Sequence, residues 1–203
     1  MNSPTLLPRD VYSLHPVEFA KTLIGAVLKV GECSGRIVET EAYTGPPEDL
    51  SSHAYTRKNS AAELIQTAGL FYVYSIHNGL AANITCNPGE FGAVLLRAIE
   101  PLEGLGSMIK RRSQSGSKIS KQWNPENYRS LRTLTNGPSK LCEALGIRKK
   151  WNRSPIGEHL RIFQRENSPV LEATERIGIS QSTEYLWRFC DANSAFLSRP
   201  RKK

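Results

Sequence analysis

Alternation of apolar and polar side chains runs through the first half of the chain and predicts β-strands there, because successive side chains of a strand point to opposite faces of a sheet. β-Branched and aromatic residues are frequent in the same segments, which is typical of strands. Asn78 and Gly79 lie between two of these segments, and an Asn-Gly pair is a common turn of a β-hairpin. The strands predicted in this half are residues 35–43, 69–79, 80–86 and 88–101.

A helical repeat of apolar residues precedes these strands. In residues 16–30, Phe19, Leu23 and either Val27 or Leu28 recur at the spacing that places side chains on one face of a helix. Only Gly25 interrupts the pattern, and glycine in a helix is tolerated at some cost. The pattern therefore predicts a helix over this segment that leads into the first strand.

The second half of the chain, after Pro101, has the pattern of a helix, a basic loop and a second helix. Gly137, Pro138 and Ser139 predict the start of this second helix, because proline is favoured in a first helical turn. Three further segments are predicted: a short helix at residues 61–69 and strands at residues 159–166 and 185–190.

Hairpins and helices that do not alternate regularly favour an α+β fold rather than a parallel α/β sheet. The chain has 203 residues, of which 39% are hydrophobic, and this is enough for one well-filled core. We therefore expect residues 1–203 to form a single α+β domain. It should have a curved, mainly antiparallel sheet, a protruding β-hairpin and surrounding helices.

The predicted strand that contains IVETEAYTG, residues 37–45, has carboxylates where a half-buried strand usually has apolar side chains. The period of two places Ile37, Glu39, Glu41 and Tyr43 on one face. An edge strand whose acids point to water is the ordinary explanation, since carboxylates are mostly exposed. The alternative is that at least one acid is buried beside an aromatic ring.

Charge is concentrated in one segment. The net charge is +8, and residues 109–150 alone contain 11 basic and 2 acidic residues. A solvated loop would explain such a run, but the absence of any acid from Lys110 to Trp123 favours a polyanionic partner. Release of counterions from phosphates would supply most of the affinity for a nucleic acid.

Several classes of protein are not favoured by the sequence. No apolar run is long enough for a membrane span and no secretory signal is visible, so we expect a soluble, cytoplasmic protein, associated with the nucleoid if bacterial. Cys33, Cys86, Cys142 and Cys190 are far apart and have no histidine at ligand spacing. A disulfide scaffold or a zinc site is therefore not expected, and buried free thiols are.

Three features together indicate chemistry: Glu41 next to Tyr43, Tyr72 and Tyr74 on one strand face, and Arg97 within an apolar strand. Each alone is more often explained by core packing or a sheet edge. Together they describe a buried carboxylate that an arginine keeps ionised, so that it can deprotonate a water beside an aromatic slot. With the basic surface, this pattern predicts an enzyme that extracts a nucleobase from DNA and cuts its bond to the sugar.

A family resemblance supports the same interpretation. The stretches RIVETEAYTGPPED, LFYVYSI, ANIT, AVLLRAIEPLEG and NGPSKLC resemble, in the same order, those of the alkyladenine (3-methyladenine) DNA glycosylase family. The resemblance runs from about Leu23 to the FLSR segment near the C-terminus.

The resemblance implies roles for the residues around the base. Glu41 matches the general base that activates the attacking water, and Arg97 matches the arginine that helps to position it. Tyr43, His53 and Tyr74 match the side chains that sandwich the flipped base. Asn83 matches the asparagine that disfavours the exocyclic amine of guanine.

The resemblance also implies DNA contacts. Lys140, Lys149 and Ser194 match residues that contact phosphates. His77 occupies the hairpin tip, where the family usually has a bulky aromatic that fills the space left by the extruded base.

The implied activity is that of a monofunctional DNA glycosylase in base excision repair, without metal or cofactor. Its partner would be double-stranded DNA containing alkylated, and also deaminated, purines, and the enzyme would act as a monomer. The alternative is a module that binds distorted DNA or structured RNA without catalysis, which the altered hairpin tip would suit.

Overall fold

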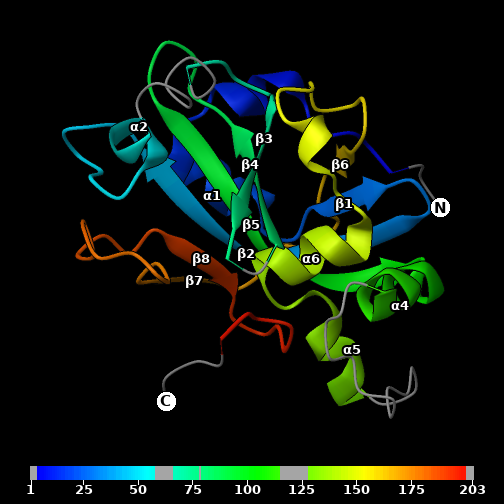
Figure 1. The fold of residues 1–203 in the computed structure, drawn as a ribbon. Helices are drawn as coiled ribbons and strands as arrows, with labels where there is room; N and C mark the ends of the chain where they lie inside the picture. Colours follow the sequence, from blue (N-terminus) through cyan, green and yellow to red (C-terminus); the bar gives the residue numbers. More distant parts are fainter. Residues whose placement is uncertain (1–3, 58–65, 78, 115–127, 200–203) are drawn as a thin grey trace.

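The computed structural model describes residues 4–57, 66–77, 79–114 and 128–199, and its centre is a twisted sheet of eight strands (Figure 1). All strand pairs are antiparallel, and the main path runs β3-β4-β5-β2-β1-β6, with β8 joined to β2 and β7 joined to β8. The strands are β1 (Val27–Val30), β2 (Cys33–Thr44), β3 (Phe71–Ile76), β4 (Gly79–Thr85), β5 (Gly92–Glu103), β6 (Arg161–Phe163), β7 (Leu171–Thr174) and β8 (Arg188–Asp191).

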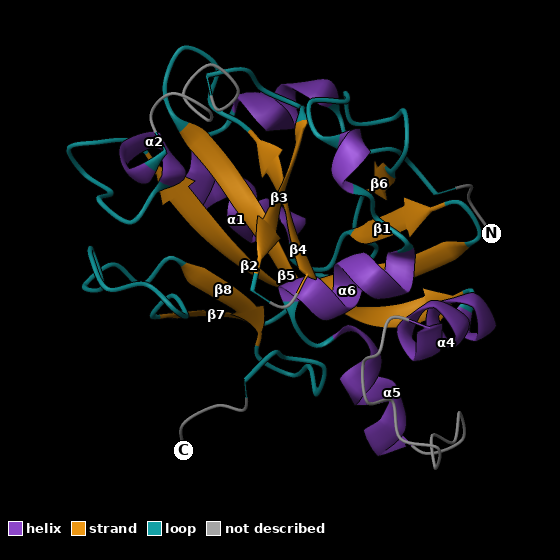
Figure 2. Cartoon of the chain, viewed as in Figure 1, coloured by secondary structure: helices purple, strands orange, loops and turns teal. Residues whose placement is uncertain are grey.

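Helices surround the sheet (Figure 2). They are α1 (Pro16–Leu23), α2 (His53–Thr56), α4 (Leu105–Gln114), α5 (Tyr128–Thr135) and α6 (Pro138–Leu145), with 3-10 helices η1 (Arg9–Ser13) and η2 (Lys149–Trp151). α6 begins with Pro138 after Gly137, as the sequence predicts, and ends at Gly146 in the left-handed conformation with φ of 71°. The predicted α+β class, the mainly antiparallel sheet and the hairpin are confirmed.

The main core lies between the helices and one face of the sheet. α1 contributes Phe19 and Leu23, α6 contributes Leu141, and β5 contributes Leu96, all with 0% exposure. Burial of a side chain of this size stabilises the fold by about 1.5–3 kcal/mol. The four cysteines are buried and free, as predicted. Among the described residues, no helix is long and apolar enough to cross a membrane.

The prediction of one helix over residues 16–30 is wrong at its C-terminal end. α1 ends at Leu23, Gly25 has a φ of +90°, and residues 27–30 form β1. Glycine adopts positive φ at no steric cost, so it breaks the helix here rather than being tolerated within it. Pairing of β1 with both β2 and β6 then outweighs the local helical pattern.

Ile37 is the one residue of the predicted acid-bearing face that lies elsewhere. It packs in the main core, whereas Glu39, Glu41 and Tyr43 share the opposite face. The pairing of β2 with β5 is irregular between Ile37 and Thr40, and such a bulge shifts the alternation of side chains by one residue.

Other predicted elements agree with the structure to different degrees. The late strands correspond to β6 and β8, whereas β7 is not predicted. Ile76 pairs with Gly79, and His77 lies at the turn between these two residues. Asn78, residues 61–65 of the predicted short helix, and residues 115–123 of the basic run lie outside the described residues.

Replacement of Gly104 tests the junction between β5 and α4. Gly104 has a φ of +74°, and a Cβ there would lie 2.7 Å from the Cys33 Sγ and 2.8 Å from the Glu32 carbonyl oxygen. We expect Gly104→Ala to lower the free energy of unfolding by about 1–3 kcal/mol, as overpacking does, in a urea titration. Gly106→Ala is the control, since it meets nothing within 4 Å in α4 and should raise stability by about 0.5–1 kcal/mol. Equal effects of the two changes would contradict the steric argument.

Candidate active site

A buried cluster of charges lies where β2 meets β5 and β8. Glu41 accepts three hydrogen bonds: from Arg97 Nη1 at 3.2 Å, from the Tyr43 hydroxyl at 2.8 Å, and from the Ile177 backbone N–H at 2.7 Å. Its side chain has no exposed surface. The alternative of an edge strand whose acids point to water is therefore wrong.

Glu39 is the second carboxylate of the cluster and is equally buried. It accepts from Arg97 Nε at 3.1 Å and from Arg188 Nε at 2.7 Å. Ser198 adds its backbone N–H at 2.6 Å and its hydroxyl at 2.7 Å. Arg97 therefore bridges Glu39 and Glu41 with two different nitrogens, which fixes the plane of its guanidinium.

The buried charges of the cluster stabilise one another in their ionised states. Burial would raise the pKa of Glu39, but Arg188 and Arg97, with the hydrogen bonds from Ser198, outweigh burial and lower it below its ordinary value. Burial also opposes the charge of Arg97, yet Glu41 and Glu39 raise the pKa of Arg97 above its ordinary value. A buried ion pair of this kind is costly to break, because it leaves an uncompensated charge.

A cavity of about 360 Å³ opens in front of this cluster. Tyr43 and Arg97 line it, and both hydrogen-bond Glu41, so that carboxylate lies directly behind the cavity wall. Of the residues matched to family roles, the lining also includes His53, Tyr74 and Asn83.

Aromatic rings form one side of the cavity. Tyr72 and Tyr74 project from the same face of β3, with ring centroids 5.2 Å apart. His53, at the start of α2, lies 4.4 Å from the Tyr74 ring, and its Nδ1 is 2.9 Å from the Tyr72 hydroxyl. Burial, followed by the charge of Arg57, lowers the pKa of His53 to about 4. His53 is therefore uncharged at neutral pH.

Tyr43 connects the aromatic side to the charged side. Burial, followed by the nearby Glu41 carboxylate, raises its pKa well above the ordinary value, so its hydroxyl stays protonated and donates to Glu41. The Arg176 guanidinium lies 4.8 Å from the Tyr43 ring centroid. Arg176 also pairs with Asp49 through two hydrogen bonds of 2.7 and 3.0 Å. The pair of Arg176 with Asp49 connects the loop after β2 to the segment that contains Ile177, whose N–H donates to Glu41.

The residues matched to DNA contacts lie outside the cavity. His77 is exposed at the tip between β3 and β4, and Lys149 is exposed in η2. Lys140 is half-buried and donates to the Asn136 side-chain oxygen at 2.8 Å. Ser194 is half-buried, and its hydroxyl accepts from the Phe196 N–H at 3.1 Å.

Asn83 is almost completely buried in the cavity wall. It pairs with Tyr72 across β3 and β4, and its Nδ2 donates to the Tyr72 carbonyl at 3.2 Å. This bond fixes the orientation of the amide with respect to anything in the cavity.

Sequence reasoning missed the residues that support Glu41. These are Asp49, Arg176, Ile177, Arg188 and Ser198, and for Glu39 only the shared strand face, not the supporting role, was predicted. The signal for Glu39 is present in its spacing of two from Glu41 on one strand. An arginine beside a run of apolar residues, as Arg188 is in YLWRFC, is a similar signal, because an unpaired buried guanidinium would be too costly.

The part of the chain that the structure describes contains no group of three or more histidine, cysteine, aspartate or glutamate side chains that could hold a metal ion. The polar side chains that line the cavity can donate hydrogen bonds to a ligand or accept them from it.

Comparison with known proteins identifies relatives over nearly the whole chain. A family model described as methylpurine-DNA glycosylase (MPG) matches residues 10–195. A protein of Nitrosospira multiformis is 40% identical over 199 residues, which cover 95% of this chain and 94% of that protein. A protein of Agrobacterium fabrum is 36% identical over 200 residues, which cover 95% of this chain and 92% of that protein. Both carry the name "Putative 3-methyladenine DNA glycosylase".

The protonation of His53 can be measured directly. Because burial lowers its pKa to about 4, the imidazole should titrate with a midpoint near that value in an NMR experiment, well below an ordinary histidine. Protonation is then easier in the unfolded chain, so this residue should reduce stability as the pH falls below about 6.5 toward 4. A midpoint near 6.5 would contradict the buried, uncharged state.

Glu39→Gln tests the charge cluster. We expect the substitution to lower the free energy of unfolding at pH 7 by about 3–5 kcal/mol, because it leaves two buried guanidinium groups with less negative charge. Since the pKa of Glu39 is lowered on folding, its contribution is present above the pKa of the unfolded residue and is lost as the pH falls through the folded pKa. The difference between the two proteins, measured in urea, should therefore shrink in acid.

The control is Glu100→Gln, which breaks the partly exposed pair with Arg36. A surface pair contributes about 0–1 kcal/mol. If the two substitutions cost the same at pH 7, the cluster around Glu39 does not have the assigned importance.

Proposed function

This chain belongs to the methylpurine-DNA glycosylase family, and on that premise we propose how it releases a damaged purine from DNA. It is a DNA-3-methyladenine glycosylase of base excision repair, a hydrolase of N-glycosyl bonds whose substrate is damaged DNA. The proposal concerns the residues that bind the base and activate the water.

Glu41 is the proposed general base. The observation that carries this assignment is its position directly behind the cavity wall, with the Arg97 guanidinium and the Tyr43 hydroxyl on one carboxylate oxygen. A carboxylate held in this way can take a proton from water while its charge favours a cationic sugar. Arg97 positions both the carboxylate and the water.

The proposed reaction is hydrolysis of the bond between the purine and its sugar. The water oxygen attacks C1′ of the sugar, its proton passes to Glu41, and the electron pair of the glycosidic bond leaves with the purine. A cationic alkylpurine leaves as a neutral base, whereas neutral hypoxanthine takes up a proton from solvent as it leaves. The products are a free base and an abasic site. No lysine is among the described residues that line the cavity, so we propose hydrolysis without a Schiff base and without cleavage of the strand.

Glu39 acts as a positioning residue in this proposal. It binds Arg97 through Nε, which leaves Nη1 directed at Glu41. Ser198 and Arg188 hold Glu39 from two other parts of the chain. The reacting pair is thus held by its neighbours rather than by the substrate.

The aromatic cavity selects the base. Tyr43, His53 and Tyr74 are proposed to sandwich the flipped purine, and attraction of a cationic alkylpurine to a ring contributes about 0.5–2 kcal/mol. The uncharged state of His53 is important here, because an imidazolium would repel a cationic purine. An uncharged ring also accepts a neutral deaminated purine, which extends the proposed substrates to hypoxanthine.

The remaining assignments concern discrimination and DNA contact. Asn83 presents an amide fixed by its bond to the Tyr72 carbonyl, and we propose that it disfavours the exocyclic amine of guanine. Exposed His77 is the proposed wedge at the hairpin tip. Lys140, Lys149 and Ser194 are proposed to contact phosphates of the duplex, with the enzyme acting as a monomer.

Glu41→Gln tests the general base. The amide keeps the shape of the carboxylate but cannot accept the proton, so release of an alkylated purine or hypoxanthine should fall by about 10²- to 10⁴-fold in a single-turnover assay. Affinity for the same duplex should remain close to that of the wild type. Abasic sites are detected by strand cleavage in hot alkali.

Glu100→Gln serves again as the matched control and should retain full activity, because Glu100 pairs with Arg36 away from the cavity. Undiminished release by Glu41→Gln would refute its role. A wild-type protein that binds the duplex but leaves no abasic site would support the binding-only alternative.

A further inference from the structure

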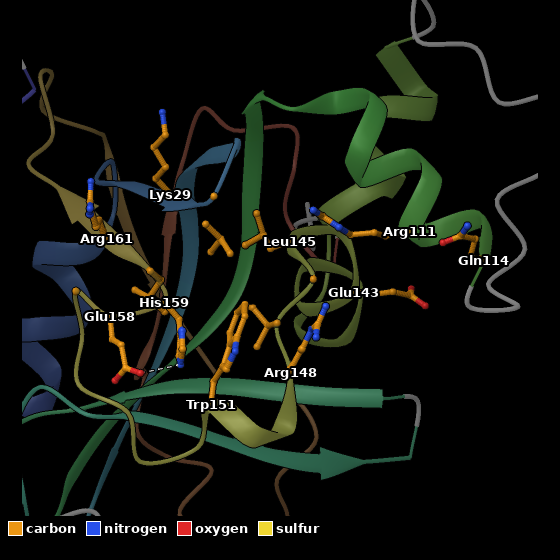
Figure 3. Close-up of a pocket in the computed structure, with 16 residues that line it drawn as sticks. Lys29, Arg111, Gln114, Glu143, Leu145, Arg148, Trp151, Glu158, His159 and Arg161 are labelled. Atoms are coloured by element: carbon orange, nitrogen blue, oxygen red, sulfur yellow. Dashed lines mark ion pairs between the residues drawn. The ribbon is translucent and has the colours of Figure 1, made fainter.

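A second, larger cavity lies at the other end of α6 from the hairpin tip (Figure 3). Its volume is about 870 Å³, and its lining includes Gly146 at the C-terminus of α6. The N-terminus of α6 faces the hairpin, since a Cβ on Gly79 would lie 2.4 Å from the Ser139 hydroxyl oxygen. The second cavity is therefore separate from the one in front of Glu41.

Cationic side chains surround this second cavity. Lys29 of β1, Arg111 of α4, Arg148 before η2 and Arg161 of β6 all line it. Lys29 and Arg111 already have acidic partners in Glu103 and Glu32. Arg148 and Arg161 are exposed, and neither forms an ion pair within the described residues.

The acids of the lining do not neutralise these two arginines. Glu143 pairs with Arg112, and Glu158 lies 3.2 Å from His159, which is charged only when protonated, so two acids face four basic side chains in the lining. The cavity therefore retains a surplus of positive charge. A guanidinium offers two parallel N–H donors, which suit a phosphate better than a single donor does.

Two aromatic rings lie between the unpaired arginines. Trp151 and His159 are stacked with centroids 4.7 Å apart and an interplanar angle of 19°. Figure 3 shows this pair between Arg161 on one side and Arg148 on the other. The cations on both sides of these rings suit the phosphates of a nucleic-acid backbone.

The segment that carries Arg148 and Trp151 is bonded to the strand that carries the base-binding tyrosines. Asn152, directly after η2, accepts from the Val73 N–H at 2.9 Å. The Arg153 N–H donates to the Phe71 carbonyl at 2.8 Å. The second cavity is thus rigidly placed with respect to Tyr72 and Tyr74 on β3.

We propose that this cavity binds the sugar-phosphate backbone of DNA several base pairs away from the damaged base. The proposal rests on the proposed function, because it takes the flipped purine to lie between Tyr43 and Tyr74. The proposal takes α6 to run along the duplex, and its 8 residues, about 12 Å long, then correspond to three or four base pairs at about 3.4 Å each. The cavity lies beyond that length, so contact requires a duplex that extends about five or more base pairs past the lesion.

Duplex length therefore separates this site from the lesion site. The double variant Arg148→Glu and Arg161→Glu should bind a duplex of about 30 base pairs with a central hypoxanthine about tenfold more weakly, with a salt slope smaller by about 2. Binding to a duplex of about 9 base pairs with the same lesion should not change. Single-turnover release of hypoxanthine should be the same for both proteins at saturating enzyme.

The matched control is Arg9→Glu with Arg165→Glu, which makes the same change in net charge at exposed positions that line neither cavity. This control should lower the affinity for both duplexes equally and only slightly. The proposal fails if the Arg148 and Arg161 variant loses equal affinity for the short and the long duplex, or loses none. Absence of base release by the wild type would refute the proposed function instead, while the dependence of binding on length would still decide this proposal.

Discussion

The sharing of one guanidinium between two buried carboxylates is the constraint on which the rest of the site depends. Arg97 binds Glu39 through Nε and Glu41 through Nη1, so neither acid can move without disturbing the other. Two negative charges next to each other would otherwise repel, and each would be costly to bury. Arg97 therefore allows both carboxylates to remain charged inside the protein.

This arrangement also gathers distant parts of the chain around β2. β5 supplies Arg97, β8 supplies Arg188, and the segment after β8 supplies the Ser198 N–H and hydroxyl. On the Glu41 side, the Ile177 N–H is held in place by the neighbouring pair of Arg176 with Asp49. Three separate positions of the C-terminal third, Ile177, Arg188 and Ser198, thus hold these two carboxylates. The catalytic assignments are proposals, but the support is a property of the fold itself.

Patterns in the sequence predicted what depends on local periodicity. The central strands, the start of α6 and the shared face of Tyr72 and Tyr74 follow from alternation and from proline and glycine preferences. The end of α1 did not follow, because β1 is defined by its partners β2 and β6 rather than by its own residues. The support of Glu41 from residues more than 100 positions away leaves almost no local signal. The grouping of the aromatic residues with Glu41 and Arg97 was suggested by spacing and by the family resemblance.

The burial of the four cysteines has a consequence for an enzyme of this kind. Reagents that methylate purines also attack thiols, and the thiolate is the reactive form. Burial raises the pKa of Cys86, Cys142 and Cys190, so each stays protonated as well as shielded. These three thiols are therefore less reactive toward the electrophiles that create the substrates of the enzyme.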